Sequence, residues 1–442
     1  MAKQLDLLRD TPRSLYTKYL VPSISGSLVT SIYLLADTIM IGRGCGAEAL
    51  AALNLVLPLF AVLFACGMLF GVGGGVLYSV ARGSGDKNRA QQIWSTSVLL
   101  AVSAAVVLTV FGLICFRPLC YALGADDTNI VMVMKYAVFV VAGAPVFVFS
   151  TFLQAFVRND RDPKRAMAAV LSGSAVNIVF DYIFIFPMKL GLTGGAAATV
   201  AGNILTVFVL LTHLRIPGNG LHFSLRTARL CEAGEILTAG APSFLIEAAT
   251  GLITFTFNRQ ILRYLGHLGV VAYGVVANYA LVMQSLFNGT GQAAQPIMAA
   301  NFGAGQRERV YAVQRMGLMT VAIFGALAVG CAVCFPVEMT ALFVELSDGL
   351  LGLAIPAIRM YFPAFVPLGI SLFLTTYLQA VVQPKPALII MVLRGVVLPV
   401  AFAFSLPLLF GGQAIFAAVL CVEGITCTVS VGLAVRNMKK GG

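Results

Sequence analysis

Asn177 and Asp181 lie four residues apart in the apolar segment VNIVFDYIFIF, residues 176–186. If the segment is helical, the two side chains project from the same face. A carboxylate in such apolar surroundings is costly unless it has a partner or a function. An amide and a carboxylate on one face supply hard oxygen ligands for a small cation, or a carboxyl group that takes up and releases a proton. The spacing therefore predicts a cation- or proton-binding site on this helix.

Two other apolar segments bring polar groups to a similar depth. Asp37 lies 15 residues after Pro22 in the first segment, and Thr199 lies near the start of the sixth. At about 1.5 Å of rise per residue, both reach the same half of a membrane as Asp181. Two nearby carboxylates in a medium of low dielectric also favour proton binding. We expect Asp37, Asn177, Asp181 and Thr199 to form one site for Na⁺ or H⁺.

The composition places these residues in a membrane. Hydrophobic residues make up 59% of the 442 residues and charged residues 11%, against about 45–50% and about 25% in soluble proteins. The apolar segments reach the roughly 20 residues that a helix needs to cross a bilayer. A β-barrel would instead show segments of about 10 residues with alternating polarity. We predict an all-α membrane protein with twelve transmembrane helices.

The basic residues indicate how the chain is oriented. The formal net charge is +11, and 21 Lys and Arg lie nearer the side of the N-terminus against 7 nearer the other side. Such an excess marks the cytoplasmic side. We expect both termini in the cytoplasm, a bacterial cytoplasmic membrane as the location, and no nucleic-acid partner.

The chain contains an internal repeat. VPSISGSLV at 21–29 faces APSFLIEAA at 241–249, and ARGSGDKNRA at 81–90 faces NFGAGQRERV at 301–310, both at a shift of 220. An even number of helices per repeat returns the chain to its starting side, so the repeats have parallel topology. Such repeats are related by a pseudo-two-fold axis along the membrane normal, with the functional cavity near their interface.

The repeat divides the chain into two six-helix lobes. We predict a cation-binding N-terminal lobe at 1–216, a cytoplasmic linker at 217–235 and a C-terminal lobe at 236–442. Two similar bundles that rock against each other would give alternating access to a cavity between them, which favours a transporter.

Three stretches resemble the multidrug and toxin extrusion (MATE) family of bacteria: YLLADTIMIGRGCGAEALAAL, FVRNDRDPKRAMAAVLSGSAVNIVFDYIFIF and GLTGGAAATVAGN. The resemblance covers nearly the whole chain. It implies a secondary active antiporter, without a cofactor, that exports amphipathic, often cationic, drugs or metabolites in exchange for Na⁺ or H⁺. In that family an acid in the first helix joins an Asn-x3-Asp pair in the fifth and a threonine in the sixth. The matching residues are Asp37, Asn177, Asp181 and Thr199.

The resemblance also concerns Pro22 and the second lobe. Pro22 matches a proline at which the first helix of the family bends, and a proline within a helix removes a backbone hydrogen bond. Some members carry acids in helices seven and ten. Glu247 is a candidate for the first, but the tenth helix here contains no acid. We therefore place ion coupling in the N-terminal lobe.

Four polar residues allow two interpretations each. Gln154 and Gln379 occupy matching repeat positions and either line the cavity or bond between helices. Arg394 lies within a predicted helix and either pairs with a carboxylate such as Glu423 or extends towards the cytoplasmic face. Glu423 in turn either pairs with Arg394 or steadies a pair of helices.

Other functions are less compatible with the sequence. A lipid or lipid-linked oligosaccharide flippase would need several arginines in its cavity, and a membrane-embedded transferase would need clustered polar catalytic residues. The three histidines are far apart in the sequence, so we expect no metal site other than one for Na⁺. We expect a monomeric transporter, not an enzyme, whose partners are small organic compounds and the lipid bilayer.

Overall fold

In a computed structural model, which describes residues 5–343 and 347–440, every regular element is a helix. The first half of the chain contains α1 (Pro12–Cys45), α2 (Ala47–Gly83), α3 (Lys87–Ile114), α4 (Phe116–Ala122), α5 (Ile130–Ala142), α6 (Ala144–Asn159), α7 (Pro163–Ile185), α8 (Leu192–Leu211) and η1 (Thr212–Arg215). The second half contains α9 (Cys231–Gly303), α10 (Arg307–Cys334), α11 (Pro336–Ala341), α12 (Asp348–Tyr361), η2 (Phe362–Ala364), α13 (Phe365–Ala380), α14 (Pro384–Val392), η3 (Leu393–Val397), α15 (Leu398–Phe410), η4 (Gly412–Ala414) and α16 (Ile415–Lys440).

The number of membrane-spanning segments agrees with the predicted twelve. Among the described residues, ten helices are long and apolar enough to cross a membrane, and the pair α5–α6, bent by 49° at its break, gives an eleventh. Helix α9 is interrupted at Gly266, whose φ of 66° is in the left-handed region. Its first arm, residues 231–265, is long enough to cross a membrane separately from the second arm, and counting both arms gives twelve. The predicted fold class is confirmed.

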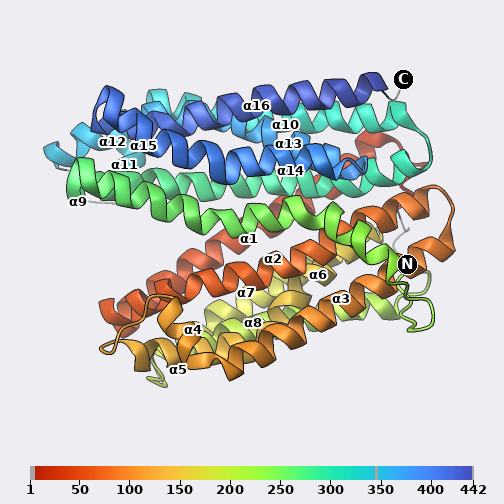
Figure 1. The fold of residues 1–442 in the computed structure, drawn as a ribbon, viewed down its shortest axis with the longest axis horizontal. Coiled ribbons are helices and arrows are strands. Elements are labelled where there is room, and N and C mark those ends of the chain that lie inside the picture. Colours follow the sequence, from red (N-terminus) through yellow and green to blue (C-terminus); the bar gives the residue numbers. More distant parts are fainter. Residues whose placement is uncertain (1–4, 344–346, 441–442) are drawn as a thin grey trace.

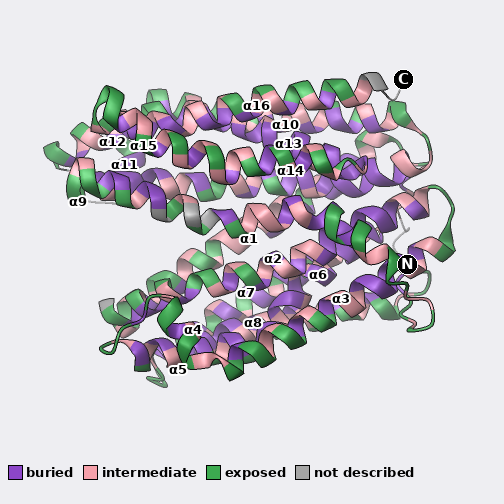
Figure 2. Cartoon of the chain, in the orientation of Figure 1, coloured by how far each residue is buried: buried purple, intermediate pink, exposed green. Residues whose placement is uncertain are grey.

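The outer surface of the bundle suits a lipid environment. Large apolar side chains on the outward faces are exposed, among them Val107, Ile114, Phe208 and Leu327. Exposed residues lie along the outside of the helices and buried ones along their inner faces (Figure 2). A soluble protein rarely exposes apolar surface of this extent, so the chain is a multi-pass membrane protein.

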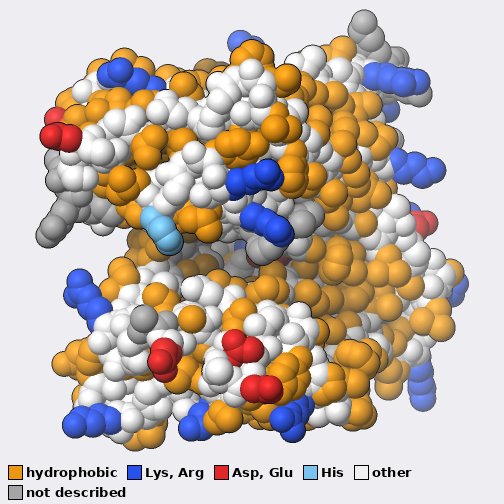
Figure 3. All heavy atoms as spheres, turned by 60° about the vertical axis from the view of Figure 1, so that its left-hand side comes forward, with side chains coloured by type: hydrophobic (Ala, Val, Ile, Leu, Met, Phe, Trp, Pro, Cys, Tyr) orange, Lys and Arg blue, Asp and Glu red, His pale blue; other side chains and the backbone are white. Residues whose placement is uncertain are grey.

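The helices form two lobes that meet at one end. We call α1–α8 the N lobe and α9–α16 the C lobe. Both termini lie at the same end of the molecule, where the lobes converge, and the lobes diverge towards the other end (Figure 1). The space-filling view shows a hollow between them on that side (Figure 3). We call the end that holds the termini the closed end and the opposite one the open end.

Two glycines explain why the closed end packs so tightly. A Cβ on Gly83 of α2 would overlap the carbonyl oxygen of Ala300 on α9, and a Cβ on Gly303 of α9 would overlap that of Val80 on α2. The same shift of 220 residues relates Gly83 to Gly303 and Val80 to Ala300. The two helices therefore cross at a point of pseudo-two-fold symmetry, where only glycine permits the contact.

The first residues of each half pack against the opposite lobe. Arg309, at the start of α10, donates hydrogen bonds to the carbonyl oxygens of Leu7 and Asp10. Its repeat counterpart Arg89, at the start of α3, forms ion pairs with Glu232 and Glu235 in the first turns of α9. We call these two sets of contacts the reciprocal clasp.

The buried cores show the same exchange. Leu15 and Tyr19 of α1 belong to the core of the C lobe, and Ile236 and Ala239 of α9 belong to the core of the N lobe. The segment between η1 and α9 covers residues 216–230. It ends before the predicted linker boundary at 235 because the first turn of α9 is helical and held by Arg89.

Candidate functional site

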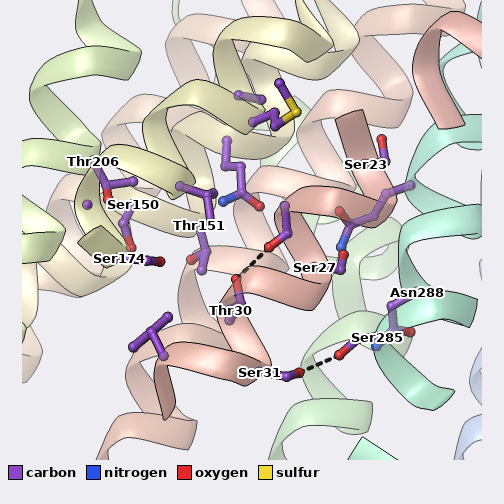
Figure 4. Close-up of a pocket in the computed structure, with 18 of the residues that line it drawn as sticks. Ser23, Ser27, Thr30, Ser31, Ser150, Thr151, Ser174, Thr206, Ser285 and Asn288 are labelled. Carbon is purple, nitrogen blue, oxygen red and sulfur yellow. Dashed lines mark hydrogen bonds between the residues drawn. The ribbon is translucent and has the colours of Figure 1, made fainter. Parts of the chain in front are cut away.

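A cavity lined by both polar and apolar side chains lies between α1, α2, α6, α7, α8 and α9. It has a volume of about 240 Å³. Ten of its lining residues carry a hydroxyl group, including Ser27 and Thr30 of α1 and Ser150 of α6, and the amide of Asn288 on α9 lies opposite (Figure 4). The hydroxyls of Ser31 on α1 and Ser285 on α9 are hydrogen-bonded to each other across the lobes. The cavity thus combines apolar wall with many hydrogen-bonding groups, and it is enclosed mainly by the N lobe and bounded on one side by the C lobe.

The four residues of the predicted ion site come together beside this cavity. Asp37 of α1 and Asp181 of α7 lie close enough for their carboxyl groups to interact directly. The Asn177 side chain donates a hydrogen bond through Nδ2 to Thr199 Oγ1 of α8, at 3.4 Å. All four are buried, with Asp181 0% exposed. Asn177 also lines the cavity, so it belongs to both sites.

Close helix packing positions these groups. Gly202 of α8 faces Gly173 of α7, and a Cβ on Gly202 would lie 2.6 Å from the Gly173 carbonyl oxygen. The absence of side chains lets α7 and α8 approach closely, as small residues do at many membrane interfaces. That approach brings Thr199, one turn before Asn203 on α8, within reach of Asn177.

Several oxygens of the site have no donor. Asp37 Oδ1, Asn177 Oδ1 and both carboxylate oxygens of Asp181 are buried and accept no hydrogen bond from an N–H or hydroxyl group in the described part of the chain. Buried acceptors are normally satisfied, and leaving one unpaired costs about 1–3 kcal/mol, more for a charged group. Four such oxygens in one place fit a positively charged guest, either a cation or a proton.

Sequence reasoning missed Tyr136 of α5. It is buried close to Thr199 and to the carboxyls of Asp37 and Asp181. Tyr136 lies in a strongly apolar helix, where a tyrosine is an ordinary core residue. Nothing in its sequence context distinguishes it.

The remaining predicted residues take different positions. Pro22, Gln154 and Glu247 line the cavity. Gln379 does not line it; its amide donates to the Ala239 carbonyl oxygen and to Ser243 Oγ of α9. Of the two glutamines at matching repeat positions, Gln154 therefore lines the cavity and Gln379 forms hydrogen bonds between helices. Helix α1 runs through Pro22 without interruption.

Arg394 and Glu423 pair in the C lobe. Arg394 Nε donates to Glu423 Oε1 at 2.8 Å, and Ser371 Oγ donates to Glu423 Oε2 at 3.3 Å. The pair is buried, with the side chains 13% and 6% exposed. Arg394 lies on the π-helical segment η3 between α14 and α15. Arg394 is therefore paired and does not extend to the cytoplasmic face, and the pair lies outside the cavity lining.

A further polar cluster lies at the closed end of the N lobe. Asp160 accepts hydrogen bonds from Tyr78, from the Gly220 backbone N–H at 2.8 Å and from His213, whose Nε2 lies 2.9 Å away. Burial by itself raises the pKa of the Asp160 carboxyl, but these hydrogen bonds outweigh it and hold the pKa below its usual range. Asp162 is similar: burial opposes its ionisation, yet His213 and Arg165 lower its pKa to about 2. Through Gly220, the cluster holds residues 216–230, which connect the two lobes and which we call the interlobe segment, against the N lobe.

Arg158 is the other residue that sequence reasoning missed. It lies in the last turn of α6, lines the cavity and is 9% exposed. Its spacing of four from Gln154 was the available signal, because residues four apart share a helix face. Its place at a predicted helix end made it resemble the other basic residues of that side.

Comparisons with known proteins agree with this architecture. The MatE family model matches residues 22–183 and 242–405, one match in each repeat. The chain is 25% identical over 422 residues to the multidrug export protein MepA of Staphylococcus saprophyticus, covering 95% of this chain and 92% of that one. It is 25% identical to MepA of Staphylococcus haemolyticus over 408 residues, covering 92% and 89%.

Solved structures share the fold. One is an outward-facing conformation of a multidrug resistance MATE family transporter of the MOP superfamily, with a TM-score of 0.92, 23% identity and coverage of 100% of this chain and 99% of that one. Another is a MOP superfamily transporter from Pyrococcus furiosus, with a TM-score of 0.91, 23% identity and the same coverage. At this identity the likeness establishes the two-lobe fold alone.

Proposed function

We propose a function from the premise that this chain belongs to the MatE family: it is a secondary active antiporter that exports amphipathic, often cationic, compounds in exchange for Na⁺ or H⁺. The excess of basic residues on the side of the termini supports a cytoplasmic location for the closed end. The open end then faces outwards, and the protein lies in the cytoplasmic membrane of a bacterium. The naming of the MepA relatives as multidrug exporters supports the substrate class.

The observation that carries the proposal is the group of four unpaired oxygens on Asp37, Asn177 and Asp181. A Na⁺ ion or a proton among them would neutralise charge that otherwise has no counterion. Both ions remain candidates, because carboxylate, amide and hydroxyl oxygens serve a hard cation and the paired carboxyls serve a proton equally well.

The ion site and the cavity share structural elements, which gives a route for coupling. Asn177 belongs to both, and Tyr33, one turn before Asp37 on α1, lines the cavity. An ion that rearranges α1 and α7 therefore changes the cavity wall. Two ligands that favour different arrangements of the same helices oppose each other's binding, which is the thermodynamic basis of exchange.

The test is dye efflux from proteoliposomes under a Na⁺ gradient alone and then under a pH gradient alone. The variants are Asp181→Asn, which keeps the side-chain volume, and Glu338→Gln, which neutralises an exposed acid as a control. We expect one gradient to drive efflux by the wild type and the control, and Asp181→Asn to lose at least 90% of the gradient-driven rate. An Asp181→Asn variant that couples as well as the wild type would contradict the site. Absence of efflux under both gradients would contradict drug export and favour the lipid flippase.

A further inference from the structure

The cavity contains a buried positive charge without a counterion. Arg158 forms no ion pair within 4.0 Å among the described residues. The only hydrogen bond of its guanidinium in the same part of the chain runs from Nη1 to Gln154 Oε1, at 2.8 Å. A guanidinium has five N–H donors, so most of them remain available. A buried charge normally has a partner.

The other buried arginine of the membrane region behaves differently. Arg394 has the Glu423 carboxylate at 2.8 Å and lies outside the cavity lining. The carboxylate of Asp160 is close to Arg158 in sequence but is directed to His213, Tyr78 and Gly220. Arg158 thus has a free set of donors at a place that a ligand can reach.

The surroundings of Arg158 are arranged as a subsite. Ser150, Gln154 and Arg158 are spaced by four residues on α6, and all three line the cavity. They share one helix face. Gln154 accepts from Arg158 through Oε1, and its Nε2 donates to no partner among the described residues, so Nε2 is available to a ligand. Donors from a guanidinium and an amide on one face suit a carboxylate, which an arginine binds with two parallel hydrogen bonds.

An acidic residue on the α9 side of the cavity indicates which second charge the ligand carries. Glu247 of α9 lines the cavity and forms no ion pair among the described residues. Glycines of α2 relate the depth of Arg158 to that of α9. Gly73 of α2 packs against Gly240 of α9, and Gly75, two residues further along α2, packs against Asn159, the neighbour of Arg158. Arg158 therefore lies at nearly the same depth as Gly240. Glu247 lies seven residues beyond Gly240, about 10 Å further from the closed end. The two unpaired charges of opposite sign are therefore at different depths of one cavity.

We propose that the Arg158 guanidinium, supported by Gln154, is an anion-binding subsite that selects compounds carrying a carboxylate in addition to a basic amine. This inference rests on the proposed export function and deepens it, because a cavity for simple cations would not retain an unpaired guanidinium. The amine is directed to Glu247 and the carboxylate to Arg158. The position of Arg158 in the last turn of α6 also complements the helix dipole, but that interaction needs no access to the cavity.

The test uses a matched pair of probes: a rhodamine dye with a free carboxylate, and its methyl ester, which is a cation of the same shape. Binding to the purified protein in lipid nanodiscs is followed by fluorescence anisotropy. The wild type is expected to bind the acid more tightly than the ester. Arg158→Gln should weaken binding of the acid by about tenfold or more, the range for hydrogen bonds to a charged group, and change binding of the ester by less than twofold.

Three further variants separate recognition from packing. Arg158→Lys keeps the charge and should retain part of the preference for the acid. Glu247→Gln should weaken the binding of both dyes, because both carry the delocalised rhodamine cation, which takes the place of the amine. Arg436→Gln removes an exposed positive charge outside the cavity lining and should leave both affinities unchanged.

Two results would overturn the inference. One is equal binding of acid and ester by the wild type, which needs no variant to observe. The other is an equal loss of affinity for both dyes in the Arg158→Gln variant, which would assign Arg158 to packing of the cavity wall. Under either result, binding of the ester would leave the proposed export function standing. If the wild type binds neither dye and moves no dye under either gradient, export itself fails and this inference fails with it.

Discussion

The buried pair of Arg394 and Glu423 allows a quantitative prediction. Removing one partner of a buried ion pair costs about 3–5 kcal/mol of unfolding free energy, because the other charge stays buried and unpaired. Glu423→Gln leaves a guanidinium that cannot lose its proton, so we expect a cost near the upper limit, about 5 kcal/mol. Arg394→Met leaves a carboxyl that can take up a proton and keep its bond with Ser371. We expect that variant to lose about 3 kcal/mol.

The double variant Arg394→Met/Glu423→Met should recover most of this loss. Replacing a whole buried pair with apolar side chains of similar volume is nearly neutral. Ser371 remains satisfied, because its hydroxyl is also hydrogen-bonded to the Leu368 carbonyl oxygen. We expect the double variant to lie within about 1 kcal/mol of the wild type.

The assay is unfolding by SDS in mixed micelles, followed by circular dichroism, together with dye efflux from proteoliposomes. Because neither residue lines the cavity, the double variant should transport at the wild-type rate. A double variant as unstable as the single ones would refute the energetic reasoning. A stable double variant that has lost coupling would show that the pair takes part in transport.

Two further predictions concern the closed end. Gly83→Ala places a Cβ against the carbonyl of Ala300, so we expect spin labels on the two lobes to move apart at this end in pulsed electron resonance, whereas Gly234→Ala, which has open space around it, should not change the distances. Because the pKa of Asp160 is lowered, its bond to the Gly220 N–H contributes stability above the unfolded pKa of about 3.9, and that contribution is lost only as the pH falls through the lower folded pKa. Protection of the interlobe segment from proteolysis should therefore persist at pH 5 in the wild type and be lost in Asp160→Asn at every pH; equal protection of both would exclude this role.

The gathering of the residues of the candidate ion site was predictable because these residues are anomalies in their own helices. Asp37, Asn177 and Asp181 interrupt apolar runs, and the free-energy cost of burying them marks them whatever the fold. Their common depth followed from the helical rise. Tyr136 and Arg158 were not predictable in the same way. A tyrosine in an apolar helix is inexpensive to bury, and an arginine at a helix end usually reaches water.

The repeat could not show what each of the two matching glutamines contacts. Gln154 and Gln379 have equal positions in the two halves, yet one faces a cavity and the other donates to Ser243. The difference arises from the shapes of the lobes, because the described cavity is enclosed mainly by the N lobe. The glycines at the closed end, Gly83 and Gly303, could be recognised in the sequence as matching positions of the repeat. The role of these glycines could not be predicted from the sequence, because it depends on where α2 and α9 cross.

The reciprocal clasp has a consequence for how the chain is made. Leu7 and Asp10 are translated about three hundred residues before Arg309, to which they bond. The first segment must wait at the membrane surface while just over two thirds of the polypeptide is synthesised and inserted. Contacts between residues so distant in sequence form late, because the closure of a long loop precedes any gain from them. During biogenesis, the closed end therefore cannot be completed until α10 has been synthesised.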